Sequence, residues 1–88
     1  MDVRSPAHVS LGWLWFDDDP KTSLEEKVRQ AAGRFQQKFG QPPRLCYVNE
    51  RALNGQPTTC GPTRVVGAGN ILPGHFLFVV EEGYLGQS

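Results

Sequence analysis

Asp17, Asp18 and Asp19 directly follow an apolar stretch and are the first residues in this chain whose types could do chemistry. Asn49 and Glu50 follow a second apolar stretch. If both stretches are parallel strands, these side chains meet at one sheet edge, where ligands of open α/β sheets gather. Carboxylate and amide oxygens suit Mg²⁺ or Ca²⁺, which would make the protein a metal-dependent enzyme. An acidic run is also favourable before a helix N-terminus. We favour that simpler explanation and predict no metal or cofactor.

Two further patterns resemble functional motifs but lack essential parts. Cys60 and His75 could supply a thiol nucleophile and a base, yet no third orienting group accompanies them. Residues 67–70, GAGN, begin like a phosphate-binding loop, but Leu72 occupies the place of the third glycine and no helix follows. Cys46 lies within an apolar strand, as a small buried hydrophobe would. We therefore predict no catalytic residue and two reduced thiols, whose separation the sequence leaves open.

Four basic residues lie in the second half of an expected helix and in the strand after it: Arg29, Arg34, Lys38 and Arg44. Such a group beside an exposed aromatic ring could bind single-stranded nucleic acid by neutralising its phosphates while a base stacks. The same residues could instead be the ordinary solvent-exposed polar face of the helix. The chain has nine Lys and Arg against nine Asp and Glu, whereas nucleic-acid-binding domains usually carry a basic excess. A nucleic-acid-associated accessory domain is therefore the second hypothesis.

The length of 88 residues predicts one domain over residues 1–88, with flexible ends at 1–7 and 83–88. A chain this short buries only about 60–65% of its unfolded surface, so its core is thin. Two cysteines are too few for a disulfide framework. No apolar run approaches the roughly 20 residues of a membrane span, and no signal peptide is evident. We expect a cytoplasmic protein with no membrane association.

An amphipathic helix is the clearest element in the sequence. Its apolar residues recur at helical spacing: Leu24, Val28, Ala31, Ala32, Phe35 and Phe39. Ser23 and Glu26 fit a capping box at its start, in which each would bond the backbone of the other, and Thr22 with Glu25 fits nearly as well, one residue earlier. Gly40 ends the pattern, and the prolines at 42 and 43 prevent its continuation.

Strands are predicted at residues 8–16, 44–49, 63–67 and 75–82. The segment 50–62 is expected to be irregular, with a brief helical turn at 49–53, and residues 72–74 fit a type II turn. Strand, helix and strand with short joints form a βαβ unit, so the first two strands should be parallel. The last two should form an antiparallel hairpin. The expected fold is α+β: a β-α-β-β-β domain with a mixed four-stranded sheet and one helix on one face.

The first strand is apolar on both faces, and one helix covers only about two strands. One face carries Val9, Leu11, Trp13 and Trp15, and the other carries Ser10, Gly12, Leu14 and Phe16. We expect the helix on the second face, because a glycine permits close approach. The predicted interface is then Leu11, Trp13, Trp15 and Leu77.

This interface could be covered by the 50–62 loop, by a second copy of the chain, or by another protein or a flat ligand. The leading hypothesis is a non-enzymatic interaction module that forms a homodimer, because symmetric homo-oligomers are the commonest assemblies.

Overall fold

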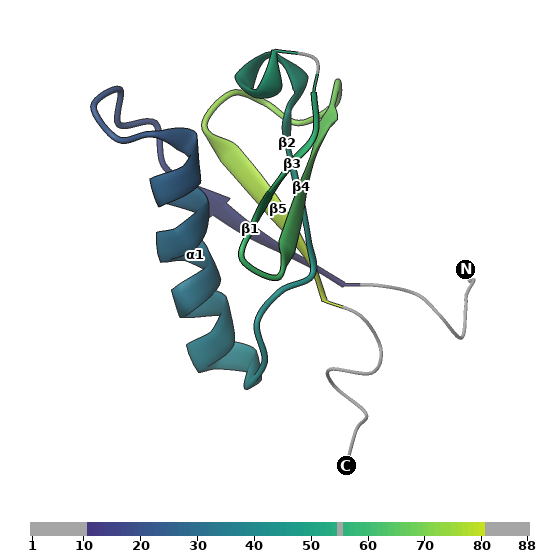
Figure 1. The fold of residues 1–88 in the computed structure, drawn as a ribbon. Coiled ribbons are helices and arrows are strands. Elements are labelled where there is room, and N and C mark those ends of the chain that lie inside the picture. The colour runs from purple at the N-terminus through teal and green to yellow at the C-terminus, as the bar shows by residue number, and fades with distance from the viewer. Residues whose placement is uncertain (1–10, 55, 81–88) are drawn as a thin grey trace, which may run out of the picture.

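The computed structural model describes residues 11–54 and 56–80, which form one helix and a five-stranded mixed sheet (Figure 1). The elements in chain order are β1 (Leu11–Phe16), α1 (Leu24–Phe39), β2 (Leu45–Asn49), the 3-10 helix η1 (Glu50–Leu53), β3 (Thr58–Cys60), β4 (Thr63–Ala68) and β5 (His75–Val80). The α+β class is confirmed, and so is the helical turn after β2. The sheet has five strands rather than four, because β3 lies in the segment expected to be irregular. The predicted flexible ends, 1–7 and 83–88, lie outside the described residues.

The strand order is β1-β5-β2-β4-β3. β5 is antiparallel to both β1 and β2, so these two strands run in the same direction with β5 between them. β2 and β4 are parallel neighbours, and β3 is antiparallel to β4. The predicted β4–β5 hairpin is therefore wrong. β5 is apolar on both faces, and an interior position between two strands shields it better than a place beside β4 would.

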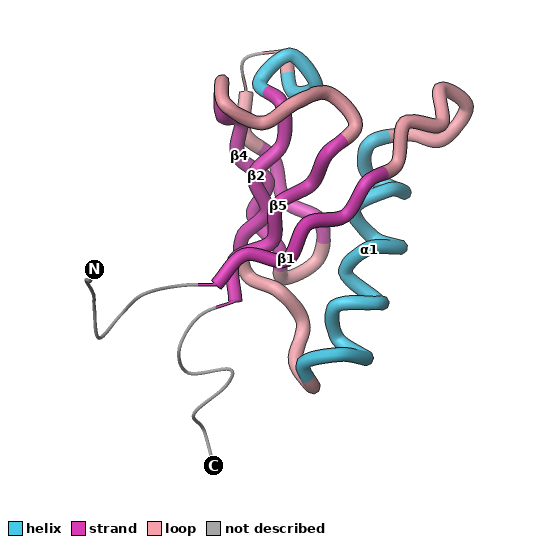
Figure 2. Tube along the Cα trace, turned by 180° about the vertical axis from the view of Figure 1, so that it is seen from behind, coloured by secondary structure: helices cyan, strands magenta, loops and turns pink. Residues whose placement is uncertain are grey.

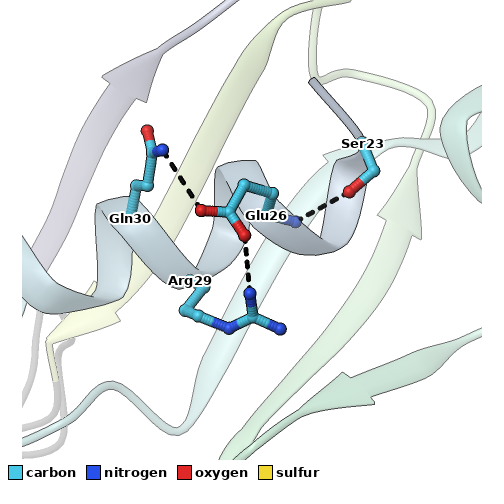
Figure 3. Close-up of polar contacts among 4 residues, drawn as sticks. All are labelled: Ser23, Glu26, Arg29 and Gln30. Carbon is cyan, nitrogen blue, oxygen red and sulfur yellow. Dashed lines mark hydrogen bonds and ion pairs between the residues drawn. The ribbon is translucent and has the colours of Figure 1, made fainter. Parts of the chain in front are cut away.

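The ends of α1 follow the sequence closely. The Glu26 backbone N–H donates to Ser23 Oγ at 3.1 Å, which confirms Ser23 as the N-cap. The Glu26 carboxylate does not return to Ser23; it accepts hydrogen bonds from Arg29 and Gln30 (Figure 3). Only half of the predicted capping box therefore forms. Gly40 ends the helix at a φ of 84°, a left-handed conformation that favours glycine.

α1 packs on the tryptophan face of β1, so the predicted docking on the glycine face is wrong. The Trp13 ring lies 5.8 Å from Phe35, 6.3 Å from Phe39 and 5.8 Å from Phe78. The large rings of α1 need large partners to fill the layer between helix and sheet, and the opposite face begins with a glycine. Close packing of these rings between helix and sheet stabilises the fold more than the shorter helix–sheet distance that Gly12 would allow.

The core lies between α1 and the alternate strand residues that share the tryptophan face. Its buried members are Val28, Ala31, Phe35, Cys46, Val48, Val65, Phe76, Phe78 and Val80. Seen from either side, α1 lies against one face of the sheet, and no helix of the described residues covers the other (Figures 1 and 2). Among residues 11–54 and 56–80, nothing forms a second layer on that face of the sheet.

Candidate interaction surface

The sheet face that points away from α1 is called the open face here, and it is mostly apolar. Its positions on the three neighbouring strands β1, β5 and β2 are Gly12, Leu14, Phe16, His75, Leu77, Val79, Leu45, Tyr47 and Asn49. Leu14 lies opposite Leu77, which in turn lies opposite Tyr47, so the apolar row crosses all three strands. The side chains of Leu14 and Phe16 are 58% and 55% exposed. None of these positions on the three strands is Asp, Glu, Lys or Arg.

The β4–β5 loop extends this surface at one end. Asn49 Nδ2 donates to the Ile71 carbonyl at 2.8 Å, and Ile71 is buried. The His75 N–H donates to the Leu72 carbonyl at 3.1 Å across a turn that contains a left-handed glycine, as a type II turn requires. This turn leaves Leu72 67% exposed. A hollow of about 380 Å³ is bordered by Leu14, Asn70, Ile71, Leu72, His75 and Leu77.

The interface predicted from the sequence is divided between the two faces. Trp13 and Trp15 are half-buried on the face that α1 covers, so they cannot form an open surface. Leu77 lies on the open face, half-buried opposite Leu14. The side chain of Leu11 lies outside what the structure describes. The error follows from the wrong choice of docking face: because α1 lies on the tryptophan face, the face of β1 expected to be covered is open and the one expected to be open is covered.

The acidic run shapes the turn between β1 and α1. Asp17 Oδ1 accepts the Asp19 N–H at 3.0 Å, and Asp18 is exposed. Asp19 accepts the Lys21 N–H at 2.9 Å and the Thr22 hydroxyl at 2.9 Å. The hydrogen bond from the Lys21 backbone, followed by that from Thr22, lowers the pKa of the Asp19 carboxyl. Asp17 and Asp19 therefore have a local structural role.

Glu50, the other candidate metal ligand, begins η1 at the end of β2. Within residues 11–54 and 56–80, no group of three or more His, Cys, Asp or Glu side chains is placed to hold a metal ion. The backbone of η1 lies close to β4: a Cβ added at Gly67 would lie 2.9 Å from Glu50 Cα. Gly67, the first glycine of the GAGN segment, therefore permits this contact between η1 and β4.

The four basic candidates do not form one patch. At 100° per residue, Arg34 and Lys38 lie about 140° and 180° around the helix from Arg29. Arg29 is also paired with Glu26, at 2.6 Å. Arg44 is exposed just before β2. Binding of nucleic acid stays a prediction, and this arrangement gives it little support.

The two cysteines are free, and neither is activated. β4 lies between their strands, so their Cα atoms are roughly 10 Å or more apart, beyond the reach of a disulfide. Burial, and then the proximity of Cys60, raises the pKa of Cys46 to about 12. Burial, and then Glu25, raises the pKa of Cys60, whereas reactive thiols need a lowered one. His75 and Cys60 lie at opposite ends of the sheet, so they cannot act as base and nucleophile.

Comparisons of the chain with protein-family models, curated proteins and solved structures find no match. Neither helical segment of the described residues is long and apolar enough to cross a membrane. The open face, with the adjoining loop, carries the exposed large apolar side chains of the described surface: Leu14, Phe16 and Leu72.

Sequence reasoning placed Leu14 and Phe16 together on one face but assigned that face to the helix. Leu72 was missed, because it lies in a loop between strands. The signal that could have corrected the choice was the size of Phe35 and Phe39, which required large partners across the layer.

Proposed function

We propose that the protein is a non-enzymatic interaction module that self-associates through the open face of its sheet. The observation that supports the proposal is the exposure of three large apolar side chains on one side of the molecule: Leu14, Phe16 and Leu72 at 58%, 55% and 67%. A large apolar side chain has an accessible surface of roughly 200 Å², and each of these three exposes more than half of it. Together they therefore present roughly 350 Å² to solvent. Apolar patches of this size on single chains are often functional.

A second copy of the chain is the occupant that this surface fits best. At ~25 cal/mol per Å², covering ~350 Å² on each of two copies contributes at most about 17 kcal/mol. Association costs an estimated 4–15 kcal/mol, so this upper limit exceeds the cost. Because β1, β5 and β2 carry no Asp, Glu, Lys or Arg on this face, two copies can meet over these three strands without repulsion between like charges; Arg64 lies on the same face in β4, beyond them. An isologous contact uses the same patch twice.

A charge placed on this surface should prevent the contact. Leu72→Glu puts a carboxylate beside Leu14 without touching a strand. Gln37→Glu, on the exposed side of α1, adds the same charge away from the surface and is the matched control. Sedimentation equilibrium over a range of concentrations should show face-to-face association at least tenfold weaker for Leu72→Glu and unchanged for Gln37→Glu. A wild-type chain that stays monomeric at millimolar concentration, or equal effects of both variants, would contradict the proposal.

A further inference from the structure

β1 is an edge strand whose outer side has no partner among the described residues. Its six residues, LGWLWF, include no charge and no proline. Proteins usually protect sheet edges with charges, prolines or very short strands, because an open edge pairs with other chains. The opposite edge follows this rule: β3 has only three residues, and Pro57 and Pro62 flank it. β1 is the exception.

The hydrogen bonds between β1 and β5 show which residues of β1 have backbone N–H and C=O groups that point to the open edge. The Asp17 N–H donates to the Gly74 carbonyl at 2.8 Å and continues the β1–β5 ladder. Alternate residues of an antiparallel strand bond to the same neighbour, so the odd-numbered residues of β1 face β5. Gly12, Leu14 and Phe16 therefore direct their N–H and C=O groups outward, and all three residues are exposed.

We propose that β1 pairs antiparallel with β1 of a second copy, across a two-fold axis at Leu14. This register brings all three outward residues into hydrogen-bonded pairs: Leu14 opposite the partner's Leu14, and Gly12 opposite the partner's Phe16 at both ends. Each pair exchanges two backbone hydrogen bonds. On the open face, the two Leu14 side chains meet, and each Phe16 ring lies beside a glycine, a cross-strand combination that suits edge glycines.

The acidic run selects the antiparallel direction for pairing with a second copy. In antiparallel pairing, the two Asp17 residues lie six positions apart along the ladder, roughly 20 Å. That separation exceeds the Debye length of about 8 Å at physiological salt. Parallel pairing would instead place residues 17–19 of both copies about 5 Å apart, where like charges repel. The strand is thus complementary to itself in one direction only.

This contact goes beyond the proposed function, because it uses the edge of the sheet rather than its open face. The two-fold axis is perpendicular to the sheet, so both helices lie on one side and both open faces on the other. The joined sheet would then present a doubled apolar surface. Each contact can form without the other, and separate variants can test them.

Disulfide trapping tests the register. Leu14→Cys places two thiols across the axis at a Cα separation of about 5.5 Å, within disulfide range. Phe16→Cys, with nearly the same exposure, places them roughly 14 Å apart and is the matched control. Both are made with Cys60→Ser, which removes the half-buried thiol. Mild oxidation should give at least tenfold more covalent dimer from Leu14→Cys, and adding Leu72→Glu should not reduce that yield.

Equal yields from the two cysteine variants, or no covalent dimer from Leu14→Cys, would overturn the pairing. A cross-link that disappears with Leu72→Glu would also overturn it, and would attribute the contact to the open face. Loss of edge pairing with the face contact intact would leave the proposed function standing. In that case a strand from a different protein becomes the candidate occupant of the edge.

A backbone test is independent of the side chain. Leu14→Pro removes an N–H that bonds nothing within the described fold, whereas Leu14→Ala keeps it. Both shorten the apolar side chain. At equal folded fraction by circular dichroism, the proline variant should associate at least tenfold more weakly than the alanine variant. Equal association would contradict the proposal, and if the proline variant fails to fold, the trapping experiment decides.

Discussion

Trp13 and Leu14 are neighbours in the sequence on opposite faces of β1, so their alanine variants test which face the helix covers. The Trp13 ring contacts Phe35, Phe39 and Phe78 at centroid distances of 5.8–6.3 Å. Removing such a ring costs about 3–5 kcal/mol of unfolding free energy. Leu14 is 58% exposed. Since full burial of a leucine contributes about 1.5–3 kcal/mol, Leu14→Ala should cost about 1 kcal/mol.

The expected difference in unfolding free energy between the two variants is large compared with a total stability of about 4–13 kcal/mol for 88 residues. Urea unfolding followed by circular dichroism measures it, at concentrations low enough to avoid association. With an m-value of about 1 kcal/mol/M, the two midpoints should differ by about 2 M or more. Sedimentation should show the reverse order, with association weakened by Leu14→Ala. If Trp13→Ala folds as stably as Leu14→Ala and loses association instead, then the tryptophans are the exposed interface and the assignment of faces given above is refuted.

The remaining predictions concern two glycines and the two cysteines. Gly33→Ala should raise the unfolding free energy by about 0.5–1 kcal/mol, because an added Cβ in mid-helix meets nothing within 4 Å. Gly67→Ala should lower it by about 1–3 kcal/mol, because its Cβ would lie 2.9 Å from Glu50 Cα; equal midpoints in thermal unfolding would refute the close packing of η1. Burial, and then Cys60, raises the pKa of Cys46 from 9.0 to about 12, so the fold loses stability as pH rises from 9.0 towards 12 and is unaffected below 9.0. Cys46→Val should show a smaller loss over that range in thermal melts, and native Cys60 should alkylate faster than Cys46.

Local rules predicted the parts of this fold that depend on nearby residues. Ser23 starts α1 because its hydroxyl reaches an N–H three residues ahead. Gly40 ends the helix because only a residue that tolerates positive φ fits there. The turn at Leu72 forms for the same kind of reason, with glycine at its left-handed position.

Non-local contacts decided the arrangement of the strands. The sequence of β5 indicates that both its faces are apolar. Its place between β1 and β2, however, depends on pairing with segments about 30 to 65 positions away. β3 was missed because a strand of three residues has almost no pattern of its own. It forms because β4 offers it an edge.

By itself, the sequence determined that one helix must cover a sheet with more apolar surface than a single helix can hide. Only the tertiary structure decided which surface remains open, because both faces of β1 are apolar and alternation cannot rank them. The choice depends on volume: the rings of α1 and β1 fill the layer between helix and sheet, and this leaves Leu14 and Phe16 exposed on the other face.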